Sequence, residues 1–186
     1  MEKLKFADIT KEDRNEFYRL MQMYARELDE HYDRNTEEEV LKNWTDTMLE
    51  RQLDTTRPRY LKFGYMQSDV IGFFYGDMDK AEDEGFKKIG YGCILEFYVL
   101  PEYRRYGYGK EMFLHLQNMF RKAGVKMMYL TADQITGKPF WEALGFTSTG
   151  EICPDNQQEV YERTVSDQVR VFKTKRIKII SCFGKE

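Results

Sequence analysis

The chain has 186 residues, which suits one domain with a sizeable core, and 41% of them are hydrophobic against 33% charged. That balance excludes a disordered chain, and no apolar run reaches the roughly 20 residues of a membrane span. The net charge of −3 excludes a generally basic surface for nucleic acid, and three scattered cysteines with two histidines do not suit a disulfide framework or a metal cluster. We therefore expect a cytoplasmic domain without metal, nucleic-acid or membrane partners.

The N-terminal part predicts a strand and a helix. Residues 4–9 are typical of a short strand, and Thr10 with Asp13 predicts the start of a helix, because side-chain oxygens accept hydrogen bonds from the free N–H groups there. Apolar residues then recur at helical spacing from Phe17 to Leu28.

A polar stretch over 29–39 interrupts this pattern. Thr36 with Glu39 predicts a capping box, followed by a second helix with Val40 and Met48 on its apolar face. The stretch itself suits solvated surface, and a second interpretation makes it a wall that attracts a cationic ligand.

The middle of the chain has the period of β-strands. Residues 59–78 predict a hairpin that turns at Ser68 and Asp69, and 79–90 predicts a charged loop. Residues 91–100 form a longer apolar strand, which Pro101 ends because it cannot extend a central ladder.

The clearest helix follows Gly109, with Gly124 placed to end it. A strand over 125–132, a short helix containing Pro139 and a last hairpin complete the expected order. Residues 166–186 are expected to be a C-terminal extension that serves as an added strand, a dimer contact or a tail.

Glycine and positive charge surround the turn from the 91–100 strand into the clearest helix, where the order is strand, Arg-x-x-Gly-x-Gly, helix. Arg104, Gly107 and Gly109 occupy the named positions. Glycines let the backbone approach a ligand closely, and N–H groups at a helix start point at one spot beside the positive end of the helix dipole. A pyrophosphate is a natural occupant, although a glycine-rich helix start without function remains an alternative. A dinucleotide-binding fingerprint and a P-loop fit less well, since Met112 and Glu111 stand at required positions.

With "FYVLPEYRRYGYGKEM" (97–112) and "FWEALGF" (140–146), the chain resembles the GNAT superfamily of acyl-CoA-dependent N-acetyltransferases, whose signature is Gln/Arg-x-x-Gly-x-Gly/Ala. The resemblance covers about residues 4–165. It implies an α/β fold with a mixed, largely antiparallel sheet, a central V-shaped splay and helices on both faces. It also implies a GNAT domain over 1–165, acetyl-CoA as co-substrate, a primary amine of a small molecule or peptide as acceptor, and a homodimer by family analogy.

The resemblance also implies a cofactor site. The pyrophosphate of coenzyme A would lie on backbone N–H groups in the glycine turn and the pantetheine beside the strand before it, with a backbone N–H near Val99 or Leu100 polarising the thioester carbonyl. The residues expected to bind the cofactor are Tyr98, Val99, Arg104, Arg105, Tyr106, Gly107, Tyr108, Gly109, Lys110 and Trp141.

The expected catalytic residues are Glu96 and Leu100, the second through its backbone. Glu96 is the only acid in the strand that leads to the glycine turn, and it could take a proton from the amine or be a solvated strand residue. Many relatives have the acid one position earlier, where this chain has Leu95, so a β-bulge would be needed to bring Glu96 to the same face.

Trp141 stands where many relatives have a tyrosine that protonates the leaving thiolate. We expect Trp141 in the core or against the pantetheine, with Tyr98, Tyr129 or Tyr161 as the acid or no acid at all. A non-catalytic acyl-CoA-binding or sensing domain is the alternative function, and an interaction module built on the C-terminal extension is a third.

Overall fold

The computed structural model describes residues 3–54 and 56–166. They form one sheet of seven strands with the order β1-β2-β3-β4-β5-β7-β6. The strands are β1 (Lys5–Asp8), β2 (Arg59–Met66), β3 (Asp69–Met78), β4 (Gly92–Val99), β5 (Met127–Thr131), β6 (Thr147–Ile152) and β7 (Glu159–Thr164). All neighbouring strands are antiparallel except β4 and β5. The expected mixed, largely antiparallel α/β fold is confirmed.

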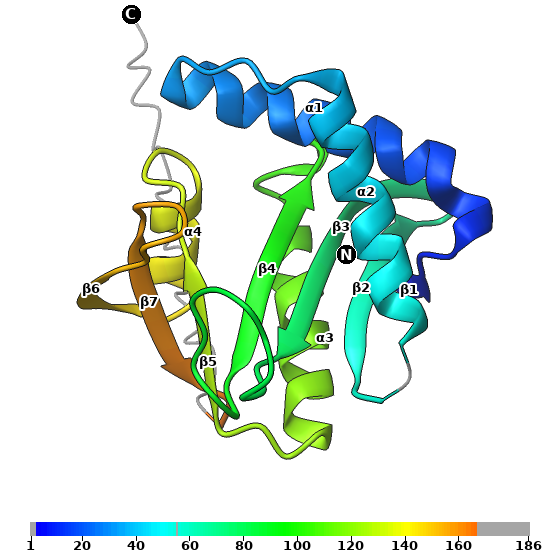
Figure 1. Cartoon of the computed structure of the whole chain (residues 1–186). Coiled ribbons are helices and arrows are strands. Elements are labelled where there is room, and N and C mark those ends of the chain that lie inside the picture. The colour runs from blue at the N-terminus through cyan, green and yellow to red at the C-terminus, as the bar shows by residue number, and fades with distance from the viewer. Residues whose placement is uncertain (1–2, 55, 167–186) are drawn as a thin grey trace, which may run out of the picture.

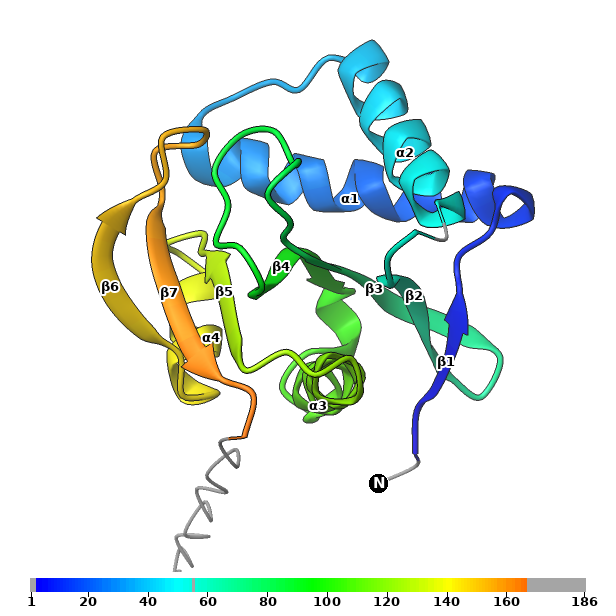
Figure 2. The same cartoon turned by 60° about the horizontal axis from the view of Figure 1, so that its bottom comes forward.

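In the part of the chain that the structure describes, four α-helices cover the two faces of the sheet. They are α1 (Arg14–Tyr32), α2 (Glu38–Leu53), α3 (Tyr108–Lys122) and α4 (Gly137–Ala143), with short 3-10 turns η1 (Lys11–Asp13) and η2 (Pro101–Tyr103). In Figure 2, α1 and α2 lie on one side of the sheet and α3 lies on the other. The core is divided accordingly: Phe17, Leu20 and Met21 of α1 pack over one face, and Met112, Phe113 and Leu116 of α3 pack under the other.

The splay between β4 and β5 is present. The two strands pair only through Gly92 with Met128 and Cys93 with Tyr129. Figure 1 shows them close together at the bottom of the view and apart at the top, beneath α1. β4 pairs with its antiparallel neighbour β3 over its whole length. Its other edge pairs with β5 only at Gly92 and Cys93, so the C-terminal part of that edge is open.

Most predicted elements lie close to their expected positions, but the region around α2 differs. The capping box is wrong: α2 begins at Glu38, and the amide and hydroxyl of Thr36 donate to Asp29 at 2.7 and 2.8 Å. Val40 is on the wrong face, with 53% of its surface exposed. The polar stretch also starts too early, because α1 continues to Tyr32 and ends at Asp33 in the left-handed conformation.

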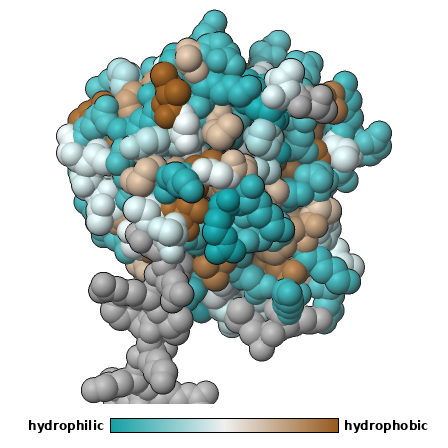
Figure 3. Space-filling model, turned by 90° about the horizontal axis from the view of Figure 1, so that it is seen from below, coloured by the Kyte–Doolittle hydropathy of each residue, from teal (hydrophilic) through white to brown (hydrophobic). Residues whose placement is uncertain are grey.

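One face of the molecule carries a mixture of hydrophilic and hydrophobic side chains (Figure 3). Seen from below in Figure 3, hydrophilic side chains cover most of the face, and the hydrophobic patches are small and separated. No helix in the described part of the chain is long and apolar enough to cross a membrane. Apart from Ser166, the expected C-terminal extension lies outside the described residues, so the division at residue 165 stays a prediction.

Candidate active site

The glycine turn presents a row of backbone amides that have no partner in the described residues. The amides of Tyr103 and Arg104 close the η2 turn onto Leu100 and Pro101, and the amide of Glu111 makes the first bond of α3, to Gly107 at 3.1 Å. Between them, the amides from Arg105 to Lys110 donate to no acceptor in residues 3–54 or 56–166. These six N–H groups are available to an anion at the N-terminus of a 15-residue helix.

The conformation of this turn suits an anion. Arg105 and Gly107 are both left-handed, with φ of 67° and 89°. Left-handed residues in a turn can direct successive N–H groups into one concavity, which is a known form of anion site. Arg105 and Lys110 make no ion pair with any described residue, so their charges can add to the attraction.

Gly109 seats the start of α3 closely against its neighbours. A Cβ atom there would lie 3.2 Å from the Phe140 ring of α4 and 3.6 Å from Cγ2 of Val99. The missing side chain therefore lets the amide row approach the C-terminal end of β4.

Arg104 differs from its expected role. Its Nη1 and Nη2 donate to the two carboxylate oxygens of Glu27 in α1 at 2.8 and 2.6 Å, and its Nε donates to the Val99 carbonyl at 2.7 Å. Its own amide donates to Pro101 at 3.2 Å. These contacts tie β4 to α1.

The prediction that Leu100 offers a free backbone donor is wrong. Its N–H donates to the Ile71 carbonyl of β3 at 2.9 Å, so it cannot also polarise a ligand carbonyl. Because N–H directions alternate along an antiparallel strand, the N–H of Val99 points the other way, into the splay. The Val99 carbonyl also lies on that side, where it accepts from Arg104. Val99 is therefore the donor that the open edge presents.

The bulge needed to turn Glu96 is present. Glu96 pairs with Tyr75 and Ile94 pairs with Gly76, so Leu95 is the extra residue of a β-bulge in β4. Its side chain is 42% exposed. As a result, Glu96 lies on the opposite face from Ile94 and shares the face of Tyr98, two residues further on, toward Tyr24 of α1. No feature of the sequence identifies Tyr24 as a neighbour of Glu96, since its spacing predicts only a place on the apolar face of the first helix.

Burial changes the acidity of this pair. Burial raises the pKa of Glu96 to about 8, although a hydrogen bond with the Tyr24 hydroxyl acts in the opposite direction. The pKa of Tyr24 is also raised, first by burial and then by the negative charge of Glu96. A carboxyl group with a pKa close to the working pH is well matched to accept a proton from an amine.

Two of the four aromatic side chains expected at the cofactor, Tyr98 and Trp141, lie inside the protein, whereas Tyr106 is 64% exposed. Tyr98 is 4% exposed, packs toward Tyr24, and has the Arg104 guanidinium 5.4 Å from its ring centre. Trp141 is 6% exposed and packs on Phe97 and Phe146, so the core interpretation holds and direct contact with a pantetheine is not supported.

The other candidate acids have partners elsewhere. The Tyr129 hydroxyl donates to Asp79, and the Tyr161 hydroxyl donates to Glu159 at 2.8 Å. The Tyr98 hydroxyl lies beside Arg104. None of these contacts directs a tyrosine hydroxyl toward Glu96.

Asp133 joins the end of β5 to the end of α1. It accepts hydrogen bonds from the amides of Thr136 and Gly137 at 2.6 and 2.8 Å and from the Tyr32 hydroxyl at 3.0 Å. Burial acts to raise the pKa of Asp133, but these hydrogen bonds outweigh it and hold the pKa below its usual range. The carboxylate therefore fixes α1 across the top of the splay.

A separate groove of about 550 Å³ lies in the angle between α1 and α2. It is lined by Tyr18, Arg26, Asp29 and other residues of α1, the following loop and the start of α2. Glu96 is not among them, so the polar stretch 29–39 borders this groove and gives no support to a wall beside Glu96. In the described ranges, no three His, Cys, Asp or Glu side chains gather where they could hold a metal.

The family follows from this fold and this site. Residues 17–146 match the family described as the acetyltransferase (GNAT) family, and the chain belongs to it. This membership makes the protein an acyltransferase. No curated protein sequence matches the chain.

Solved structures with the same fold include three N-acetyltransferases at low identity. PaiA N-acetyltransferase from Thermoplasma acidophilum, in complex with coenzyme A, is 17% identical with a TM-score of 0.66, covering 87% of this chain and 98% of that one. Aminoglycoside 6'-acetyltransferase type Ii is 13% identical with a TM-score of 0.63 and coverages of 89% and 98%. The ribosomal-protein-S18-alanine N-acetyltransferase from Escherichia coli is 14% identical with a TM-score of 0.57 and coverages of 89% and 96%.

Proposed function

We propose that the protein transfers an acetyl group from acetyl-CoA to a primary amine of a small molecule or peptide, by direct attack while both substrates are bound. The observation that carries the proposal is the row of unpartnered amides from Arg105 to Lys110 beside the open edge of β4. The diphosphate of coenzyme A matches that row in charge and in its need for donors. The similar PaiA structure, which contains coenzyme A, supports the same choice of co-substrate.

The residues of the splay then divide the chemistry between them. The Val99 N–H donates to the thioester oxygen, where negative charge develops during attack. An alkyl amine has a pKa near 10.4, so only about one molecule in a few thousand is neutral at pH 7. Ionised Glu96 accepts the proton that the nitrogen loses as the new C–N bond forms. The C–S bond then breaks, and the thiolate leaves.

The leaving group needs no dedicated acid. A thiol has a pKa of about 8.5, so the thiolate is a stable product near neutral pH and takes its proton from solvent. The positions of Tyr129 and Tyr161 agree with this scheme, because their hydroxyls are bound to Asp79 and Glu159.

A reducing cytoplasm remains our expectation for the location of the protein. Cys93 and Cys153 are both free and buried, which agrees with that expectation.

Two glycines offer a matched test of the cofactor site. Gly107 and Gly124 flank α3, with φ of 89° and 81°, so alanine at either position carries a similar strain of about 1–2 kcal/mol. Only Gly107 belongs to the amide row. We expect Gly107→Ala to weaken coenzyme A binding at least tenfold by calorimetry, while Gly124→Ala leaves it within twofold.

The transfer step is tested by a thiol-release screen of acetyl-CoA against polyamines, aminoglycosides, amino acids and peptides, with intact mass to locate the acetyl group. Release with one class of amine supports the transferase. Binding of coenzyme A without release for any amine would favour the non-catalytic sensing domain. No heat with millimolar coenzyme A on a folded sample would reject both.

A further inference from the structure

Arg104 joins the two parts of the site that the proposed reaction must bring together. Its guanidinium makes a two-point contact with Glu27 of α1, at 2.8 and 2.6 Å, and its Nε donates to the Val99 carbonyl at 2.7 Å. Both side chains are largely buried, with 31% of Arg104 and 21% of Glu27 exposed. Planar forked pairs of this kind fix geometry better than a lysine contact does.

The contact holds one peptide group of β4 at both ends. The Val99 carbonyl and the Leu100 N–H belong to the same planar peptide. Arg104 holds the carbonyl, and Ile71 of β3 holds the N–H at 2.9 Å. This peptide directly follows the Val99 N–H that points into the splay. Its fixed plane therefore restricts the direction of that donor.

The same contact reaches the base through α1. Glu27 lies one helical turn after Tyr24, so the two side chains are on neighbouring parts of one helix face. Tyr24 packs on Tyr98 of β4, with 5.4 Å between the ring centres, and the negative charges of Glu96 and Glu27 both act to raise the pKa of its hydroxyl. A shift of α1 away from β4 would disturb both the Val99 donor and the base.

We propose that Arg104 and Glu27 form a positioning pair that sets the Val99 donor and α1 in register for transfer, and that Arg104 does not bind the phosphates of coenzyme A. This inference rests on the proposed transferase function. It assigns the phosphate attraction to the backbone amides together with Arg105 and Lys110, whose side chains have no ion partner in the described residues.

Two conservative substitutions separate positioning from phosphate binding. Arg104→Lys keeps the charge but loses the fork, and Glu27→Gln keeps the shape but weakens the pair. We expect each to lower kcat tenfold or more in thiol release from acetyl-CoA, with n-butylamine as the probe acceptor. The Kd of coenzyme A and the KM of acetyl-CoA should stay within twofold. The double variant should be no worse than either single variant, because both remove the same contact.

The controls come from neighbouring positions. Glu30 lies one turn after Glu27 in α1, and Glu30→Gln should leave kcat unchanged. Arg105→Gln removes a charge beside the amide row and should raise the Kd of coenzyme A. Thermal melting of each variant checks that the loss of kcat is not a loss of folded protein.

The opposite pattern would overturn the inference. If Arg104→Lys weakens coenzyme A binding tenfold while Glu27→Gln leaves binding unchanged or tighter, Arg104 is a phosphate ligand. Additive losses in the double variant, or a kcat that neither substitution changes, would also reject the pair. A wild-type protein that binds no coenzyme A or acetylates no amine would instead reject the proposed function.

Discussion

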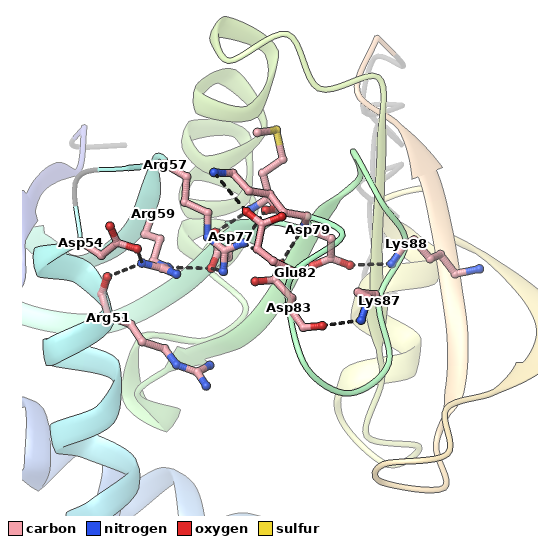
Figure 4. Close-up of polar contacts among 12 residues, drawn as sticks. Arg51, Asp54, Arg57, Arg59, Asp77, Asp79, Glu82, Asp83, Lys87 and Lys88 are labelled. Atoms are coloured by element: carbon pink, nitrogen blue, oxygen red, sulfur yellow. Dashed lines mark hydrogen bonds and ion pairs between the residues drawn. The ribbon is translucent and has the colours of Figure 1, made fainter.

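The two ends of β4 differ in how completely their polar groups are paired. At the closed end, Gly92 and Cys93 have strand partners on both sides, in β3 and β5. Figure 4 shows that Arg57 and Arg59 converge on Asp77 nearby, where the β2–β3 hairpin meets the charged loop. At the open end, β4 has one neighbouring strand, and the amides of the glycine turn have no partner in the described residues.

This difference separates stability from binding along a single strand. Buried polar groups that are paired hold a structure together, whereas donors left without a protein partner are free to meet a ligand. Pairing at the closed end fixes the angle between the two halves of the sheet. Because of that angle, the unpartnered amides and Glu96 lie at the open end. Substitutions at the closed end should therefore change the free energy of unfolding, and substitutions at the open end should change kcat or coenzyme A binding.

The largest effect is expected from Glu96→Gln at the open end. Removal of a general base lowers kcat by about 10²–10⁴-fold. In the wild type, kcat/KM should rise with pH through about 8, because the carboxyl must be ionised to accept a proton. The variant should lack that inflection and rise only as the amine itself becomes neutral. Steady-state rates between pH 6 and 10 check both points.

The same substitution should make the fold more stable. The pKa of Glu96 is about 8 in the folded protein against an ordinary value of 4.5, so between these pH values the folded state binds more protons than the unfolded one. Wild-type stability therefore falls as pH rises across that window, and Glu96→Gln removes the fall. A wild-type melting temperature that stays flat across the window would contradict the buried carboxyl.

Asp77→Ala should break the closed end. Asp77 accepts from Arg59 at 2.8 Å and from Arg57 at 3.1 Å, and only 7% of its side chain is exposed. Arg57 keeps Asp83 and Arg59 keeps Asp54. Removal of Asp77 therefore takes one of two carboxylate partners from each guanidinium, which costs about 1–3 kcal/mol in the free energy of unfolding. Urea denaturation checks the loss. The folded fraction should still bind coenzyme A.

An exposed ion pair provides the control for Asp77. Asp8 pairs with Lys62 at 2.6 Å, but 62% of its side chain is exposed. Asp8→Ala should therefore cost no more than about 1 kcal/mol. Equal losses in the free energy of unfolding for Asp77→Ala and Asp8→Ala would contradict the idea that buried ion pairs stabilise the closed end.

The fold was predictable where the signal is local. The apolar face of α3, with Met112 and Phe113, follows a 3.6-residue period, and Gly124 ends the helix with the positive φ that its position predicted. The glycine turn was found for the same reason, since the strand, the turn and the helix start are adjacent in sequence.

Long-range features of the site were not predictable in this way. The position of the bulge at Leu95 depends on how β4 registers against Tyr75 and Gly76, which a single strand does not encode. Glu27, the ion partner of Arg104, lies 77 positions away in the sequence. The glycine turn alone therefore predicts that the charge of Arg104 faces a phosphate. The prediction of Leu100 as the free donor is wrong for a similar reason, because the direction of its N–H depends on pairing with β3.

Gly72→Ala should test how tightly the open end is held from β3. A Cβ atom at Gly72 would lie 2.2 Å from the Tyr98 carbonyl oxygen, which is backbone and cannot rotate away. Overpacking of this kind costs about 1–3 kcal/mol. Since the displaced peptide precedes Val99, kcat should also fall. Gly90→Ala is the control, with a φ of 80° and no atom within 4 Å of its Cβ, and should leave kcat unchanged.

The smallest effect is expected from Tyr24→Phe, which keeps the ring and removes the hydroxyl that contacts Glu96. That hydrogen bond lowers the pKa of Glu96, so its loss should move the inflection in kcat/KM to higher pH. At pH 7 a smaller fraction of the base is ionised, and the rate should fall roughly two- to fivefold, the size expected for one hydrogen bond. At pH 9.5 the rate should return close to the wild-type value. Tyr18→Phe, on the α2 side of the same helix, should leave the profile unchanged, and a loss that persists at high pH would give Tyr24 a role beyond tuning Glu96.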